Sequence, residues 1–132
     1  MRIPREVREM IRTDHVVQVA TSDPQGIPHI AAAKGLQILD EEHLVFENWF
    51  CFQTLENLSS NPHVAVSILN PGGENGYQLV GTVERTSATE MLDGHIPGEF
   101  ERFGAIPQTK TQLQVKVEKV LELSTGPHAD DV

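Results

Sequence analysis

The chain has 132 residues, which is the size of one ordinary domain and too short for two. Its formal net charge is −9, from 10 Lys and Arg against 19 Asp and Glu, and this argues against nucleic acid or an anionic membrane as a partner. No apolar run approaches the roughly 18 residues of a membrane-spanning helix, and the single Cys excludes an internal disulfide. We therefore expect a cytoplasmic protein in a reducing compartment.

The first third of the chain predicts a helix followed by a hairpin. Apolar residues recur at helical spacing over residues 2–12, and β-branched residues favour a strand over residues 15–21. Residues 23–26 carry Asp, Pro and Gly at the positions that a β-turn favours. A second strand is expected over residues 27–34, and residues 35–39 continue or bend it.

The middle of the chain predicts a strand that leads into a helix. The strand covers residues 43–47, a polar and aromatic corner covers 48–53, and the helix covers 54–60 before Asn61-Pro62 ends it. The first backbone N–H groups of a helix have no internal partner, and the helix dipole adds positive potential there. This corner is therefore a candidate anion site, and it also contains Trp49 and Cys51.

The second half of the chain predicts three further strands. They cover residues 63–69, 77–85 and 112–122, and apolar and polar residues alternate along the last two. A loop of breaker residues covers 70–76. Ser87 followed by Glu90 forms a capping box that predicts a short helix over residues 88–93, and one more helical turn is expected over 99–103. Six short antiparallel strands with small helices indicate a mainly β, closed or nearly closed barrel. We assign residues 1–124 to one domain and residues 125–132 to a flexible tail.

Short matches in a fixed order run from the first strand to the fifth. They are Val19-Ala20-Thr21, residues 23–26, Pro28-His29, Leu39-Asp40, Leu44-Val45-Phe46, Thr54-Leu55-Glu56-Asn57-Leu58, Asn61-Pro62, Val64-Ala65-Val66 and Tyr77-Gln78-Leu79-Val80-Gly81. Together they resemble the pyridoxamine 5′-phosphate oxidase-like family of FMN-binding split barrels over roughly residues 16–84. The spacing of the whole set carries the resemblance, because no single match is specific.

The resemblance implies a six-stranded antiparallel split β-barrel with small flanking helices, as a homodimer with one FMN in each of two clefts between the subunits. It places the flavin phosphate near the end of the second strand and the start of the helix expected over residues 54–60. Together with the composition of the corner, it gives these candidate cofactor-binding residues: His29, Ala31, Ala32, Ala33, Lys34, Glu47, Asn48, Trp49, Gln53, Thr54, Tyr77 and Gln78.

These candidates have different implied roles. The flavin ring would lie beside residues 29–33 and beside Glu47 and Asn48 at the end of the third strand. The flavin of the partner subunit would be approached by Tyr77 and Gln78. Gln53 departs from the basic residue that the family usually carries there. The phosphate would then depend on Thr54, Lys34 and the helix N–H groups.

Several of these residues also have a purely structural interpretation. Thr54 is equally a helix N-cap, and Lys34 a solvated charge at a strand end. Trp49 is a core or interface aromatic residue, or it stacks near the flavin. Cys51 is a small buried residue, or a thiol made more reactive by the helix N-terminus.

The function we predict is an FMN-dependent oxidoreductase with an unknown substrate and electron donor, and with no assigned catalytic residue. The C-terminal Arg- and Trp-bearing segment of true pyridoxamine phosphate oxidases is missing, which disfavours that activity. One alternative is a non-catalytic module that binds or carries FMN, a deazaflavin or a tetrapyrrole. Another is a barrel that has lost its ligand and acts as a dimeric interaction protein.

The six His residues are scattered without helical metal spacing, so we predict no metal site.

Overall fold

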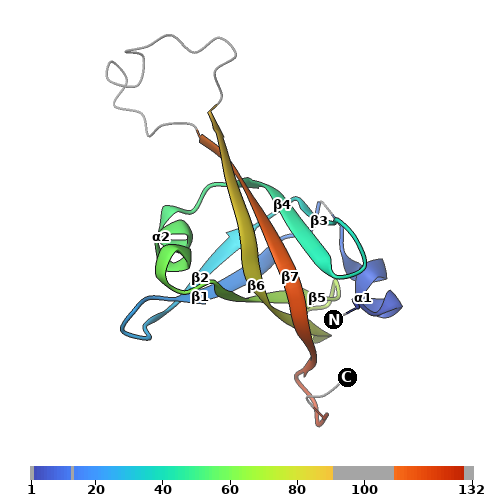
Figure 1. The fold of residues 1–132 in the computed structure, drawn as a ribbon. Coiled ribbons are helices and arrows are strands. Elements are labelled where there is room, and N and C mark those ends of the chain that lie inside the picture. Colours follow the sequence, from blue (N-terminus) through green and yellow to red (C-terminus); the bar gives the residue numbers. More distant parts are fainter. Residues whose placement is uncertain (1, 13, 91–108, 130–132) are drawn as a thin grey trace.

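The computed structural model describes residues 2–12, 14–90 and 109–129, which form a curled antiparallel sheet with two short helices (Figure 1). In chain order the elements are α1 (Arg5–Met10), β1 (Val17–Ser22), β2 (Pro28–Ala33), β3 (Leu36–Ile38), β4 (His43–Trp49), α2 (Phe52–Ser60), β5 (His63–Leu69), β6 (Asn75–Glu90) and β7 (Thr109–Ser124). The mainly β, split-barrel fold class is confirmed.

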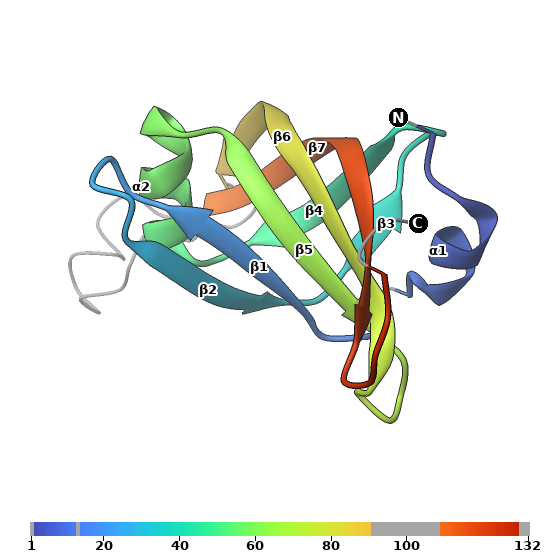
Figure 2. The same cartoon turned by 90° about the horizontal axis from the view of Figure 1, so that it is seen from below.

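One sheet contains all seven strands of the described residues, in the order β2-β1-β5-β6-β7-β4-β3. Its two edges, β2 and β3, are separated in the chain only by Lys34 and Gly35. Such a linker reaches about 10 Å, so the sheet must curl until its two edges come close to each other, as Figure 2 shows. Gly35 has a φ of +83°, which turns the chain here and makes β3 a separate seventh strand.

The core follows from the register of the strands. One row of paired residues crosses five neighbouring strands, and all five of its side chains are buried. The row consists of Ala31, Val19, Val66, Leu79 and Val120. Directly paired residues lie on the same face of a sheet, so this row forms part of the inner wall of the barrel. The two helices lie at opposite ends of the barrel (Figures 1 and 2).

The helix predicted over residues 88–93 is wrong where the structure describes it. β6 continues to Glu90, and its last described pairs with β7 include Ala88 with Thr111 and Glu90 with Thr109. A capping box is a local preference of about 1 kcal/mol, and here a continuous backbone ladder between two long strands outweighs it. The remainder of that prediction, and the helical turn predicted over residues 99–103, lie outside the described residues.

Both predicted helices that the structure describes have different limits from those expected. α1 covers only Arg5–Met10, with Pro4 as its N-cap residue. α2 begins at Phe52, two residues earlier than expected, and Cys51 is its N-cap residue. The interpretation of Thr54 as an N-cap is therefore wrong. Thr54 is the third residue of α2, on the face that packs against the barrel.

No helix in the described parts of the chain is both long enough and apolar enough to cross a bilayer.

Candidate functional site

A pocket of about 330 Å³ opens beside the linker between the two edges of the sheet. Three segments form it: the end of β2 with the linker, the end of β4, and the residues that lead into α2. Its lining residues are Ala32, Ala33, Lys34, Gly35, Asn48, Trp49, Phe50 and Cys51. We call it the seam pocket. Its size is at the lower end of the range of small-molecule sites.

One wall of the seam pocket is made of small side chains. Ala32, Ala33 and Gly35 leave the backbone of β2 and its linker accessible to a ligand. Lys34 stands between them with an exposed side chain. This wall therefore offers a flat surface for an aromatic ring and one cation for an anion.

Trp49 anchors the opposite wall. Its side chain is only 2% exposed, and its ring packs edge-on against Phe46 with the two ring centroids 5.1 Å apart. The indole Nε1–H donates to the carbonyl oxygen of Cys51 at 3.0 Å. Trp49 thus holds the corner between β4 and α2 in one conformation.

The N-terminus of α2 lies next to this corner, because Cys51 is both a lining residue of the pocket and the N-cap residue of the helix. The side-chain hydroxyl of Thr54 is fully buried and has no hydrogen-bond partner in the described structure. Gln53 does not supply a charge here, and its amide nitrogen donates to Asn57 Oδ1 at 3.0 Å. Asn57 in turn donates to Thr21 Oγ1 at 3.0 Å, which ties α2 to β1.

Cys51 and His29 come together at the rim of the pocket, with Sγ and Nε2 3.4 Å apart. Burial raises the pKa of the Cys51 thiol, but three nearby groups together lower that pKa to about 7: the Thr54 hydroxyl, the Thr54 backbone N–H and His29. A hydroxyl near the sulfur favours the charged form, because a thiolate accepts a hydrogen bond more strongly than a neutral thiol.

The structure brings most of the predicted site residues to this region. Five line the seam pocket directly: Ala32, Ala33, Lys34, Asn48 and Trp49. His29, Gln53 and Thr54 lie beside it, around Cys51 and the first turn of α2.

Ala31 and Glu47 lie on the same strands as lining residues but do not line the pocket themselves. The Ala31 side chain points into the core, because it alternates with the exposed Ala32 along β2. Glu47 is half-buried and accepts a hydrogen bond from the side chain of Gln112 at 2.9 Å.

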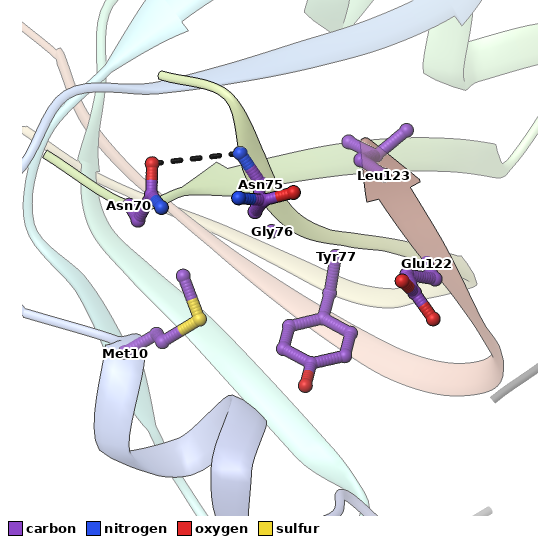
Figure 3. A pocket seen from close by; sticks show the side chains of 7 residues that line it. All are labelled: Met10, Asn70, Asn75, Gly76, Tyr77, Glu122 and Leu123. Atoms are coloured by element: carbon purple, nitrogen blue, oxygen red, sulfur yellow. Dashed lines mark hydrogen bonds between the residues drawn. The ribbon is translucent and has the colours of Figure 1, made fainter. Parts of the chain in front are cut away.

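Tyr77 and Gln78 lie near the end of the barrel away from α2. They pair with Ile68 and Ser67 of β5 and therefore point to opposite faces of the sheet. Tyr77 helps to line a second pocket of about 300 Å³, shown in Figure 3, together with Met10, Asn70, Asn75, Gly76, Glu122 and Leu123. Within one subunit these two residues are thus separate from the seam pocket. Their predicted approach to a partner's flavin stays a prediction.

Three lining residues were missing from the predicted set: Gly35, Phe50 and Cys51. Cys51 stood out in the sequence as the only Cys. Its contact with His29 joins residues 22 positions apart, and no local pattern indicates such a contact. Phe50 has a side chain that is 74% exposed, which apolar patterning does not predict.

Comparison with known proteins identifies the family. A sequence model described as pyridoxamine 5′-phosphate oxidase matches residues 3–124. The chain belongs to this family. An uncharacterised protein of Methanocaldococcus jannaschii is 30% identical over 128 residues, which cover 92% of this chain and 83% of that protein.

Solved structures of family type share the fold. An FMN-binding protein from Syntrophomonas wolfei superposes with a TM-score of 0.66 at 16% identity, covering 92% of this chain and 86% of that one. An F420 reductase superposes with a TM-score of 0.65 at 20% identity, covering 89% of this chain and 98% of that one. At these identities the likeness extends to the fold alone.

Proposed function

We propose that this family member is an FMN-binding oxidoreductase that acts as a homodimer, with the flavin phosphate held at the seam pocket. The observation that supports this most directly is the composition of the pocket. It combines one cation, Lys34, and the N-terminus of α2 with a wall of small side chains. Phosphates favour helix N-termini, and flat rings favour walls without bulky side chains.

The phosphate would be held by charges close to the pocket and not by the overall field of the protein. The whole chain has a net charge of −9, so its overall field opposes an anion. The N-terminus of α2 contributes the equivalent of about half a positive charge, and Lys34 contributes one more. Gln53 adds no positive charge, because its side chain is a neutral amide that donates to Asn57.

Bound flavin would supply the hydride or electron chemistry. The residues of this chain would bind and orient it. The small side chains Ala32 and Ala33 would allow the ring to approach the backbone of β2, and Asn48 would offer a polar side chain at the opposite wall. Trp49, fixed by its hydrogen bond to Cys51, would exclude water from one side.

A second copy of the chain would complete the site, because the outer face of the sheet is apolar where solvent would favour polar residues. A row of outward-facing residues runs next to the inner core row and crosses β2, β1, β5 and β6. It consists of Ile30, Ala20, Ala65 and Val80. Ile30 is 65% exposed. Antiparallel sheets with one face in water normally alternate apolar and polar residues, so this row indicates a covered face.

A deazaflavin coenzyme is the second candidate ligand. The F420 reductase with this fold favours it. The two coenzymes share a tricyclic ring but differ in the phosphate-bearing tail. Direct comparison of their affinities distinguishes the two candidates.

Titration with FMN and with coenzyme F420, followed by quenching of ligand fluorescence, tests the proposal. Saturable binding of FMN, followed by its anaerobic reduction with NADH or NADPH, supports an oxidoreductase. Binding without reduction by any donor indicates a carrier, and tighter binding of F420 shifts the assignment to the deazaflavin. If neither ligand binds at high concentration, the proposed function is wrong.

Lys34→Gln provides a sharper test of the phosphate contact. Loss of one exposed cation beside a phosphate should cost about 1 kcal/mol, which is roughly a five-fold weaker Kd for FMN. The difference from wild type should shrink as salt is added, because salt screens the charge. Lys116→Gln, on β7 and away from the seam pocket, is the matched control and should leave the Kd unchanged. Equal effects of both variants would remove Lys34 from the site.

A further inference from the structure

Cys51, His29 and Thr54 form a cluster that flavin binding does not require. We propose that Cys51 and His29 act as a thiolate–imidazolium pair that reacts with hydrogen peroxide, so that Cys51 is a site of sulfenic acid formation. This proposal does not depend on the proposed function, since every group that it uses belongs to the protein itself.

Geometry provides the first argument. The Cys51 sulfur lies 3.4 Å from His29 Nε2, which allows proton transfer between the two side chains. Cys51 is half-buried and lines the seam pocket, so a small reagent reaches the sulfur from the pocket. Reactive cysteines typically combine partial exposure with a nearby imidazole and a helix N-terminus. All three conditions are met here.

The buried hydroxyl of Thr54 supports the same proposal. Thr54 is fully buried, and its Oγ1 has no partner in the described structure. A buried hydroxyl without a partner is destabilising, because it has lost its hydrogen bonds to water. A thiolate at Cys51, and then the oxygen of a sulfenic acid, would each offer the missing acceptor.

The charges around the sulfur support the same reaction. The groups that face it are the Thr54 hydroxyl and backbone N–H from α2 and His29 from β2, and they lower the Cys51 pKa to about 7 despite its burial. Lys34 lines the same pocket and adds positive charge. About half of the Cys51 side chains would then be thiolate at neutral pH, against about 3% for an ordinary thiol.

The reaction balances with hydrogen peroxide as the only co-reactant. Cys51 transfers its thiol proton to His29, and the thiolate attacks one peroxide oxygen. An S–O bond forms while the O–O bond breaks, and sulfur loses the two electrons that the peroxide gains. The departing hydroxide takes the proton from the His29 imidazolium and leaves as water. His29 ends neutral, as it began.

The test compares two reagents on the purified, ligand-free protein at pH 7. Iodoacetamide reports only the thiolate, whereas hydrogen peroxide also needs a proton for its leaving group. Alkylation and oxidation are followed by intact mass, with a dimedone probe to trap the sulfenic acid. An unstructured peptide with one cysteine and blocked ends, called the model peptide, serves as the ordinary thiol, and Cys51→Ser defines the background.

We expect Cys51 to react with iodoacetamide about 3-fold faster than the model peptide. Cys51 has about 15-fold more thiolate, but a more acidic thiol is less nucleophilic, which offsets part of this gain. The peroxide rate of Cys51 should exceed that of the model peptide by more than about 3-fold. His29→Gln should lower the peroxide rate at least 10-fold and the iodoacetamide rate less, whereas His63→Gln, at the start of β5, should change neither.

Thr54→Val keeps the side-chain shape and removes the hydroxyl, so it should slow both reagents by a few fold. It also serves as the second variant if His29→Gln fails to fold, which circular dichroism would reveal. Equal slowing of both reagents by His29→Gln would exclude proton donation by His29. A wild-type peroxide rate no faster than that of the model peptide, or no dimedone adduct, would overturn the proposal altogether. An absence of FMN binding would affect neither result.

Discussion

At the scale of single residues, His43 shows how the local surroundings set a side chain's charge. Nδ1 lies 2.8 Å from Asp40 Oδ1, and Nε2 lies 2.6 Å from Glu84 Oε1. The hydrogen bond to Asp40 raises the His43 pKa most strongly, burial opposes it, and Glu84 raises it further. His43 is 19% exposed. The protonated form therefore joins the turn before β4 to β6.

A pH dependence of stability follows from this pair of contacts. Because folding raises the His43 pKa, its stabilisation is fully present below the unfolded-state value of about 6.5 and is lost as pH rises through the folded-state pKa. We expect the difference in unfolding free energy between wild type and His43→Gln to decrease as the pH rises above about 6.5. Urea unfolding at several pH values measures it. Glu84→Gln should reduce the slope, and a difference that is constant with pH would contradict the expectation.

At the scale of elements, the linker between β2 and β3 decides both the fold and the site. Lys34 and Gly35 join opposite edges of the sheet, and both line the seam pocket. Gly35 has a φ of +83°, a conformation that side chains with a Cβ rarely adopt. The same residue thus allows the barrel to curl and leaves space at the pocket.

A comparison of Gly35 with Gly26, which has the same φ, separates the effect on the fold from the effect on the pocket. Gly26, in the turn between β1 and β2, also has a φ of +83°, and neither position has an atom close to an added Cβ. Gly35→Ala and Gly26→Ala should each lower the unfolding free energy by about 1 kcal/mol. Only Gly35→Ala should also weaken FMN binding, since only Gly35 lines the pocket. Urea unfolding and FMN titration measure the two effects, and equal Kd values for both variants would contradict the placement of the site.

At the scale of the whole molecule, the same strands bury one face and leave an apolar row on the other. The inner row is buried, whereas the outer row contains Ile30, Ala20, Ala65 and Val80 at varying exposure. Phe50 and Phe52, 74% and 53% exposed, add apolar surface beside the seam pocket. These surfaces agree with a dimer that completes the cofactor site.

Ala65→Lys tests that dimer at the centre of the outer row, where Ala65 pairs with both Ala20 and Val80. A charge buried at an interface without a partner is costly, so this variant should be monomeric in analytical ultracentrifugation. It should also bind FMN more weakly. Gln37→Lys, exposed on β3, is the control and should remain dimeric. A monomeric wild-type protein would rule out the proposed assembly.

The sequence predicted the features that depend on local patterns. β-branched residues and apolar alternation identified the strands, and the turn at residues 23–26 identified the first hairpin. The order of short matches identified the family, which the family model over residues 3–124 confirms. Local rules were less successful at boundaries. The capping box at Ser87 and Glu90 predicted a helix where pairing with β7 extends β6, because a ladder with a distant strand contributes more than one cap.

Composition, alternation and turn chemistry by themselves determined a small, mainly β domain with a strand–helix corner as its candidate site. Only the tertiary structure decided which side chains meet there. His29 reaches Cys51 because β2 lies beside the start of α2, and Ala31 turns away because the strand alternates. The curl of the sheet brings these segments together, and that curl arises from the pairing of strands far apart in the chain. Contacts of this kind depend on the whole sheet, so no short stretch of sequence encodes them.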